Sequence, residues 1–157
     1  MTEGSTQYDG LAHVRYDGEI WSGYDARTTI GGLDEAGVEP IAQRGVVSRA
    51  VLLDMARFRG RDTLDEGETS THEDLKVPNL ATDTIADEVT FDPDTGVALV
   101  LHNALMRDLG VTLTEIADLE QFAADCAEDG RYAFLHVAAP LEVARGSGSP
   151  VNSVVIE

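Results

Sequence analysis

Near its N-terminus the chain carries a polar segment, Ser5-Thr6-Gln7-Tyr8-Asp9-Gly10-Leu11-Ala12-His13, and the expected fold is built outward from it. If this segment is extended, side chains alternate, so Gln7, Asp9 and His13 point to one side and converge on a single ion. Carboxylate oxygen and imidazole nitrogen are ordinary ligands of zinc and manganese. The alternative is that Asp9 caps a turn at Gly10 and that His13 is a partly buried ring without a ligand.

This segment and the residues after it resemble the metal-site region of the cyclase family, which includes kynurenine formamidase. The resemblance is carried by Gln7-Tyr8-Asp9-Gly10-Leu11-Ala12-His13-Val14, Tyr16-Asp17-Gly18 and Trp21-Ser22-Gly23-Tyr24. Family members have the pattern His-x-Gly-Thr-His-x-Asp-x-x-x-His here. On this chain the pattern's named positions fall on Glu3, Ser5, Thr6, Gln7, Asp9 and His13.

Two departures from that pattern bear on the metal. Glu3 and Gln7 stand where the family has its first two histidines. Glutamate still binds a divalent ion, whereas glutamine offers only a weak carbonyl oxygen. The resemblance therefore implies a metal site that includes Asp9 and an altered ligand at Gln7, with His13 as the residue that transfers protons.

Composition limits the partners. With 157 residues, 43% of them hydrophobic and 6% aromatic, we expect one modest core and a single domain over residues 1–157. A net charge of −18, from 29 acidic and 11 basic residues, argues against nucleic-acid and anionic-membrane partners and leaves a small-molecule substrate. Lys76 is the only lysine, and a surface poor in lysine and rich in carboxylates suggests a halophilic protein.

Cysteine use and hydropathy predict the compartment. Cys126 is the only cysteine, so no internal disulfide forms and a reducing interior is the simpler setting. No apolar run has the length of a membrane span, and the polar first residues lack a signal-peptide core. We therefore expect a cytoplasmic protein.

The aromatic residues after the polar segment have two interpretations. Asp17-Gly18 predicts a hairpin turn between short strand-prone runs. Tyr16, Trp21 and Tyr24 either form the wall of a substrate pocket beside the metal or belong to an ordinary core, because aromatic side chains line both.

Residues 44–56 contain the clearest strand pattern, an apolar and β-branched run typical of a buried strand. Asp54 at its end is expected to cap the following turn or to pair with Arg57. Residues 71–75 predict the start of a helix with Thr71 as its N-cap, which leaves His72 on the surface.

The resemblance breaks at Lys76-Val77-Pro78 and covers residues 5–75 and 80–157. Family members continue there with further strands and helices, so an internal deletion near residues 76–79 is expected. A sheet that lacks interior strands exposes apolar faces and unpaired edges. We therefore expect a homodimer that covers them.

The second half supplies the remaining ligands. Residues 97–102 predict a short apolar strand with His102 at its end. The resemblance makes His102 and Glu115 metal ligands, with Glu120 as the substitute for the second. Thr112-x-x-Glu115 also fits a helix capping box, in which the glutamate needs no metal.

The C-terminal part reads as one helix and two strands. Apolar residues at helical spacing over 115–128 predict a helix that ends at Gly130 and buries Cys126. Residues 132–141 and 154–156 predict strands, with His136 in the core and a tight loop over 146–152. The loop lacks the Walker spacing, so it predicts no phosphate site.

Together these features predict an α/β fold, the swivelling β/β/α domain of the cyclase type with central strands missing. The resemblance implies metal-dependent hydrolysis of an amide C–N bond, as in N-formylkynurenine, by an arylformamidase-like enzyme of tryptophan catabolism. The resemblance further implies that zinc or manganese is bound by Asp9, His102, Glu115 and Gln7, and we expect Tyr16, Trp21 and Tyr24 to contact the substrate. The alternatives are a degenerate, oligomeric binding or structural protein and a hydrolase of a different cyclic amide.

Overall fold

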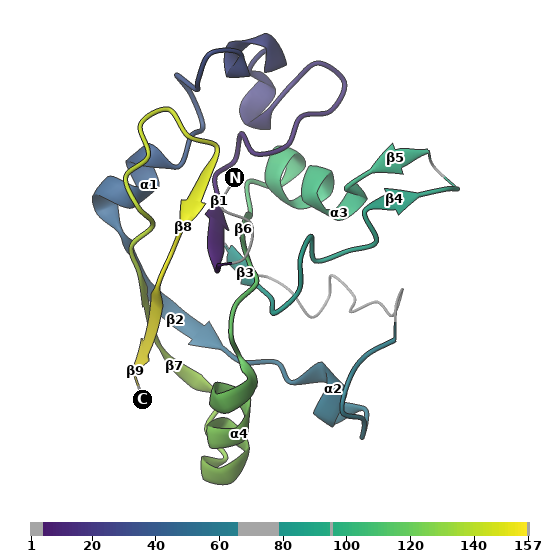
Figure 1. The fold of residues 1–157 in the computed structure, drawn as a ribbon, viewed down its shortest axis with the longest axis vertical. Helices are drawn as coiled ribbons and strands as arrows, with labels where there is room; N and C mark the ends of the chain where they lie inside the picture. The colour runs from purple at the N-terminus through teal and green to yellow at the C-terminus, as the bar shows by residue number, and fades with distance from the viewer. Residues whose placement is uncertain (1–4, 66–78, 95, 157) are drawn as a thin grey trace.

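The computed structural model describes residues 5–65, 79–94 and 96–156, and in them the chain forms two main sheets and a short hairpin (Figure 1). The first sheet has the order β3-β6-β1-β8, and β1 runs antiparallel to both of its neighbours. Its strands are β1 (Gln7–Asp9), β3 (Asn79–Ala81), β6 (Thr112–Glu115) and β8 (Gly148–Pro150). The second sheet is antiparallel, with the order β2-β7-β9. It consists of β2 (Val46–Val51), β7 (Ala133–Ala138) and β9 (Ser153–Ile156).

Short helices and one hairpin complete the fold, so the predicted α/β class is confirmed. The hairpin pairs β4 (Phe91–Asp92) with β5 (Val97–Ala98). The helices are η1 (Trp21–Gly23), η2 (Ala26–Thr29), α1 (Glu39–Arg44), α2 (Met55–Phe58), α3 (Val100–His102), η3 (Asn103–Asp108) and α4 (Glu120–Asp129). None of the helices in the described ranges is long and apolar enough to cross a bilayer.

The chain turns sharply after β1. A Cβ atom on Gly10 would lie 2.9 Å from the backbone nitrogen of Val38 and 3.1 Å from the carbonyl oxygen of Ser147, so only glycine fits there. The backbone N–H of His13 then donates to the carbonyl of Gly10 at 2.8 Å. His13 therefore returns toward Asp9 through a turn, and the predicted strand alternation up to residue 13 is wrong.

One small apolar cluster joins the two sheets. Tyr8 on β1 packs with Ala138 on β7 and with Val38 and Val151. The Tyr8 hydroxyl also shares a hydrogen bond of 2.7 Å with the hydroxyl of Thr112 on β6. The phenol ring is buried and its hydroxyl has a hydrogen-bond partner, so Tyr8 holds the first sheet, through β1, against the second sheet.

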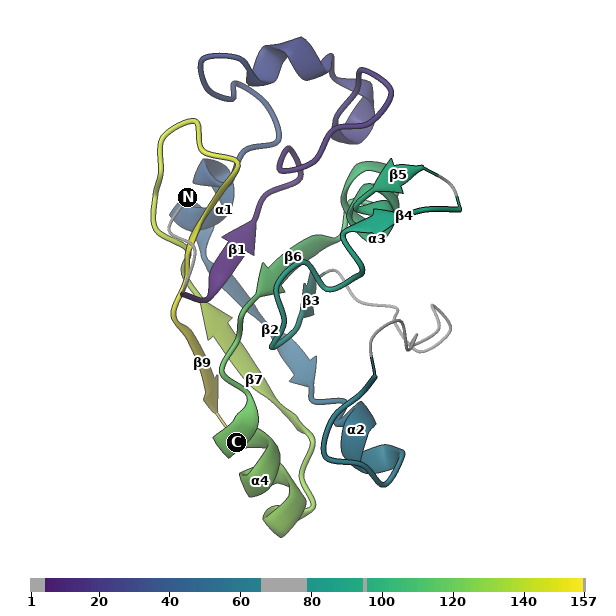
Figure 2. The same ribbon diagram turned by 45° about the vertical axis from the view of Figure 1, so that its right-hand side comes forward.

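A second cluster holds the helical segment α3–η3 beside the first sheet, on the opposite side from β8 (Figures 1 and 2). Met106 from η3 and Leu113 from β6 are fully buried together with Val14. The π-helical turn of η3 follows His102 directly, and turns of this kind are frequent at functional sites. This packing sets the position of His102.

The strand predicted within 44–56 forms, but it is not buried. In β2 every second side chain is exposed, with Val47 at 68% and Val51 at 50%. The other face of this sheet is covered at β7, where Phe134 meets Phe122 of α4 edge to face at 4.6 Å. Asp54 caps α2 and pairs with Arg57 at 3.0 Å, as predicted.

Two predictions around the ligand residues are wrong. Residues 97–102 are not one strand, because Leu99 adopts a left-handed conformation (φ 54°) and His102 lies in a helical turn. The helix predicted from residue 115 begins at Glu120, and Glu115 ends strand β6, which excludes the capping box with Thr112.

Other local predictions are confirmed. Asp17 and Gly18 both have positive φ, and the flanking Tyr16 and Glu19 form an antiparallel bridge. Gly130 ends α4 in the left-handed conformation, and Cys126 is buried in that helix. The expected helix start at residues 71–75, with His72, and the break at residues 76–78 lie outside the described residues.

Candidate metal centre

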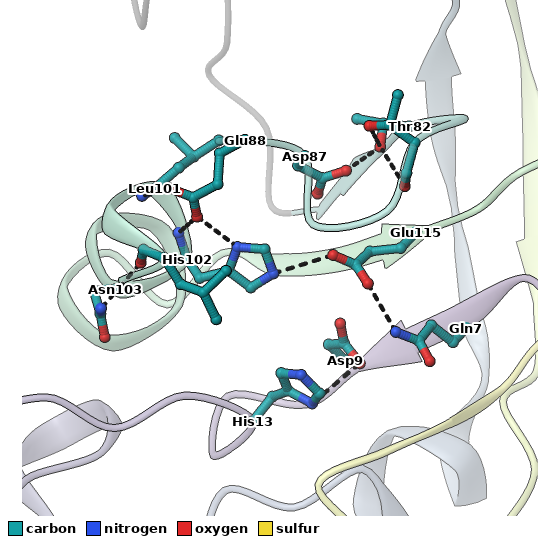
Figure 3. Close-up of polar contacts among 12 residues, drawn as sticks. Gln7, Asp9, His13, Thr82, Asp87, Glu88, Leu101, His102, Asn103 and Glu115 are labelled. Atoms are coloured by element: carbon teal, nitrogen blue, oxygen red, sulfur yellow. Dashed lines mark hydrogen bonds and ion pairs between the residues drawn. The ribbon is translucent and has the colours of Figure 1, made fainter. Parts of the chain in front are cut away.

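Three buried ligand-type side chains meet at the ends of β1, β6 and α3 (Figure 3). In the antiparallel register Gln7 lies opposite Glu115, so Asp9, two residues further along β1, is on the same face of the sheet. His102 of α3 completes the group. The exposed fractions of Asp9, His102 and Glu115 are 1%, 2% and 4%, and one ligand atom from each lies within 4.8 Å of the others.

Burial of several acids in one place perturbs their ionisation. Burial, reinforced by the charge of Glu115, raises the pKa of Asp9 to about 7. Burial also raises the pKa of Asp87 to about 6, against the opposing effect of its hydrogen bond from Thr82. A bound cation would remove this penalty, because it neutralises the carboxylates where they stand.

The tautomer of His102 is set by Glu88. The carboxylate of Glu88 accepts from the backbone N–H groups of Leu101 at 2.6 Å and His102 at 2.8 Å, and its Oε1 lies 2.7 Å from Nδ1 of His102. An ionised carboxylate only accepts, so Nδ1 of the imidazole carries the proton that it donates to Glu88. In the neutral form of the ring with its proton on Nδ1, the Nε2 atom presents a lone pair to the centre.

That lone pair faces another acceptor. Nε2 of His102 lies 3.1 Å from Oε1 of Glu115, and Oδ2 of Asp9 is buried without a hydrogen-bond partner among the described residues. Such an arrangement needs a proton or a metal ion between the acceptors. Bonds of about 2.0–2.2 Å in a tetrahedral zinc site place two ligand atoms about 3.5 Å apart. The three side chains, whose ligand atoms lie within 4.8 Å of one another, would therefore fit a divalent cation after the widest pair contracts by about 1 Å.

Gln7, predicted as a ligand, contacts another ligand instead. Its Nε2 donates to Oε2 of Glu115 at 2.7 Å. The bond uses the oxygen of Glu115 that does not face His102, so it orients that carboxylate. The structure thus places Gln7 beside the centre, with its amide nitrogen turned to Glu115.

His13 lies at the edge of the centre. Its Nδ1 is 3.3 Å from Oδ1 of Asp9, yet the angles do not make a hydrogen bond and Nδ1 has no partner among the described residues. Its ring centroid is 6.4 Å from that of His102. Burial, with a smaller contribution from His102, lowers the pKa of His13, so its ring is neutral near pH 7.

Gly148 makes room for Asp9. It lies opposite Asp9 in the β1–β8 pairing, and a Cβ atom there would lie 2.7 Å from Oδ1 of Asp9. The segment 146–152, predicted as a loop, contains strand β8, which pairs with β1 beside Asp9. The close spacing of its glycines was the available sequence signal.

The predicted aromatic contacts are not grouped at the centre. Trp21 lines a pocket of about 350 Å³ with Arg107, and this pocket has no residue of the Asp9–His102–Glu115 group. Tyr16 lies beneath the guanidinium of Arg107 at 5.9 Å, and both Tyr16 and Tyr24 are exposed.

Sequence reasoning gave no role to Glu88 or Asp87. Both are in an irregular segment before β4 and reach the centre only through tertiary contacts. A pair of adjacent acids 14 residues before a histidine was the only signal, and such pairs are common in this acidic chain.

The comparisons with known proteins come from structure. No family model matches the sequence, and no curated protein matches it. A crystal structure described as a novel cyclase, of the cyclase family, matches with a TM-score of 0.84 and 28% sequence identity, covering 98% of this chain and 69% of that chain. The similarity in fold and sequence, together with the Asp9–His102–Glu115 group, supports assignment of this α/β chain to the cyclase family, without distinguishing kynurenine formamidase from other members.

Proposed function

We propose that the chain is a metal-dependent hydrolase of an amide C–N bond, with an N-formyl aromatic amine such as N-formylkynurenine as substrate and formate as one product. The observation that carries this proposal is the buried convergence of Asp9, His102 and Glu115, in which Nε2 of His102 lies 3.1 Å from Oε1 of Glu115. A set of two carboxylates and one imidazole suits zinc or manganese. When bound, such an ion supplies Lewis-acid chemistry, polarising a carbonyl and lowering the pKa of water toward neutrality.

The residues around the ion have separate tasks. Glu88 holds the proton on Nδ1 of His102 and so keeps Nε2 free for the ion. Gln7 restrains the Glu115 carboxylate through the 2.7 Å hydrogen bond. Burial at this site excludes bulk water, which strengthens every charge interaction within it.

His13 is the proton carrier in this proposal. Its neutral ring has an unpartnered Nδ1 next to Asp9, and its side chain is 20% exposed, so it reaches both the centre and the adjoining solvent. His13 accepts a proton from the attacking water and returns it to the leaving nitrogen, as a general base and then a general acid. The lowered pKa of His13 keeps it in the form that can accept this proton.

One observation favours a second candidate, a non-catalytic binding protein. Gln7 stands where the family pattern has a histidine, and its amide turns to Glu115. In that case the exposed apolar residues of the second sheet form a homodimer interface, and the Asp9–His102–Glu115 group has lost its catalytic role. Metal content and turnover separate the two candidates.

The test is reconstitution followed by an assay. Protein stripped with a chelator and then dialysed against Mn²⁺ or Zn²⁺ should retain about one ion per chain by elemental analysis and should hydrolyse formanilide. His13→Ala should keep the ion and lose most of the turnover, about 10²- to 10⁴-fold for a general acid–base residue.

His136→Ala is the matched control. His136 is also a partly buried histidine whose pKa is lowered by burial, but it lies on β7 of the second sheet. Its replacement should leave turnover unchanged. Absence of a stoichiometric ion, with equal activity in the His13 variant and the wild type, contradicts the proposed function.

A further inference from the structure

A second pocket, of about 330 Å³, opens beside His13 and away from Trp21. Its walls include the polar residues His13, Arg15, Thr29, Arg145 and Ser147, and none of its lining residues is acidic. In a chain with 29 acidic and 11 basic residues, this wall has two arginines and no acidic residue. Arg145 is paired with Asp34, which does not line the pocket, so the local reversal of charge comes from Arg15. Such a reversal attracts anions into the pocket.

Arg145 is held in place by the backbone of residues 32–34. Its Nη2 donates to the carbonyl of Gly32 at 3.0 Å and pairs with Asp34 at 3.1 Å, and its Nε donates to the carbonyl of Leu33 at 3.4 Å. Gly32 has φ +107°, and a Cβ atom there would come within 3.0 Å of the Arg145 side chain. Glycine at position 32 therefore lets the guanidinium lie against the backbone, where its side-chain freedom is already lost before any ligand binds.

Arg145 itself has an unusual backbone conformation. Its φ is +58°, which costs a non-glycine residue of the order of 1 kcal/mol. The strain is held by hydrogen bonds from its N–H to Glu39 and from the N–H of Leu33 to its carbonyl. After these contacts, Nη1 of Arg145 still has no partner among the described residues, so one edge of the guanidinium is available.

Arg15 is the less occupied of the two. It lies two residues after His13, and its one contact among the described residues is a hydrogen bond of 3.2 Å from Nη1 to the hydroxyl of Thr29. Thr29 in turn donates to the carbonyl of Ala26 at 2.7 Å, which fixes the direction of its lone pairs. No carboxylate of the described residues pairs with Arg15. Its planar guanidinium can therefore donate two parallel hydrogen bonds to a ligand carboxylate.

We infer that this pocket is a carboxylate subsite, in which Arg15 and Arg145 bind a carboxylate carried by the substrate while His13 stands at the amide to be cleaved. The assignment of the amide rests on the proposed function, whereas binding of the anion does not. The substrate class is then an N-acyl amine that bears a carboxylate a few bonds from the amide. A singly charged group suits a pocket in a chain of net charge −18, where Arg145 is already bonded to two backbone carbonyls and paired with Asp34.

The first experiment measures binding alone, by calorimetry on protein freed of metal with a chelator. N-formylanthranilate and formanilide share the ring and the formamide and differ in the carboxylate. Wild-type protein should bind N-formylanthranilate about 10- to 100-fold more tightly, the range expected for one charge-assisted pair of hydrogen bonds. Equal affinity for the two compounds would overturn the inference.

Variants locate the preference. Arg15→Gln should remove most of it, because Arg15 has only Thr29 to lose besides the ligand. Arg49→Gln is the matched control, since Arg49 is an exposed arginine on β2 that does not line the pocket. A preference that survives in Arg15→Gln, or that falls equally in Arg49→Gln, contradicts the assignment.

Two further measurements keep the test decisive if Arg15→Gln does not fold. Raising the salt concentration should weaken the binding of N-formylanthranilate relative to formanilide in wild-type protein, because an exposed ion pair is screened. Inorganic phosphate should compete no better than acetate. A salt-independent preference, or phosphate binding tighter than N-formylanthranilate, would overturn the carboxylate subsite.

Activity separates this inference from the proposed function. If metal-loaded protein hydrolyses neither compound but the metal-free protein prefers the carboxylate, the subsite stands and the hydrolase proposal fails. If both compounds are cleaved with similar kcat/KM and bound with similar affinity, the hydrolase stands and the subsite fails.

Discussion

The two main sheets of this protein use burial in opposite ways. The sheet β3-β6-β1-β8 buries charged and polar groups, among them Asp9 and Glu115 at its centre. The sheet β2-β7-β9 leaves apolar side chains in solvent, with Val47, Leu135 and Ile156 exposed on adjacent strands. Burying charged groups in the first sheet costs folding free energy, and leaving apolar side chains of the second sheet in water gives up the stabilisation that their burial would provide. We therefore expect the isolated metal-free chain to be marginally stable, with a bound ion and a covered second sheet as the two stabilising additions.

The largest effect should come from removing a charge at the centre of the first sheet. Asp9→Asn keeps the shape of the side chain but removes a carboxylate that would hold the proposed ion. A metal supplies several kcal/mol of transition-state stabilisation, so kcat/KM for formanilide should fall by about 10³-fold or more. Asp83→Asn, at an exposed position in the segment that leads to Asp87, is the control and should keep full activity. Equal activity in both variants contradicts a catalytic metal at Asp9.

The same pair of variants reveals the cost of burying acids. In metal-free protein the pKa of Asp9 is about 7 and that of Asp87 about 6, both above the ordinary aspartate value of 3.8. The folded state therefore binds more protons than the unfolded state between about pH 4 and pH 7, so stability is greatest below this window and falls as pH rises through it. At about 1.4 kcal/mol per pKa unit, Asp9 alone should contribute a loss of about 2–4 kcal/mol.

Urea unfolding in the presence of a chelator measures this loss at each pH. Asp9→Asn should be more stable than wild type at pH 8 and should flatten the pH dependence, whereas Asp83→Asn should follow the wild type. Adding Mn²⁺ or Zn²⁺ at pH 8 should restore stability to wild type and not to Asp9→Asn, because only the wild type has the full ligand set. A wild-type stability that rises from pH 4 to pH 7 would contradict the buried, unpaired acid.

A smaller effect should follow from crowding the centre without changing its charges. Gly148→Ala places a methyl group 2.7 Å from Oδ1 of Asp9, so that carboxylate or strand β8 must move. Overpacking of this kind costs about 1–3 kcal/mol, and we expect metal affinity to fall by about 10- to 100-fold. Competition with a fluorescent chelator measures the affinity. Gly130→Ala is the control: a Cβ atom at Gly130 meets nothing within 4 Å, and α4 is remote from the centre, so stability falls but metal affinity does not.

How far the sequence predicts this molecule depends on the range of the interactions. Features set within a few residues are predictable: the Asp17-Gly18 turn, the Asp54 cap and the end of α4 at Gly130. His102 and Glu115 are assigned as ligands through the resemblance to a family, since 13 residues separate them, whereas Asp9 is also indicated by its spacing to His13 in the polar segment.

What the sequence did not predict depends on tertiary contacts. The fold gives His102 a helical position because Leu99 takes a left-handed conformation, which a leucine does not signal. The contact of Glu88 with His102 depends on where the fold places the loop before β4, and the Gln7–Glu115 hydrogen bond depends on the register of β1 with β6. The two arginines of the second pocket are at positions 15 and 145, and tertiary packing, including the contacts of residues 32–34 with Arg145, brings them to one pocket.

The smallest change in the stability of the isolated chain should come from a substitution on the exposed face of the second sheet. A small effect on the monomer allows an effect on assembly to be recognised. Val47 is 68% exposed, so Val47→Thr should change the stability of a monomer by less than about 0.5 kcal/mol. If a second copy covers this sheet, as expected from its apolar face, the same substitution should weaken assembly and make the melting temperature depend less steeply on protein concentration. Light scattering over a hundredfold range of concentration measures assembly, and thermal melts over the same range measure the melting temperature. Ser48→Thr, on the opposite face of the same strand, is the control for β-propensity, because it adds a methyl group without touching the exposed face. A wild-type chain that stays monomeric across that range contradicts the homodimer, and the apolar side chains of the second sheet then remain in solvent while the buried acids of the first depend on the ion alone for compensation.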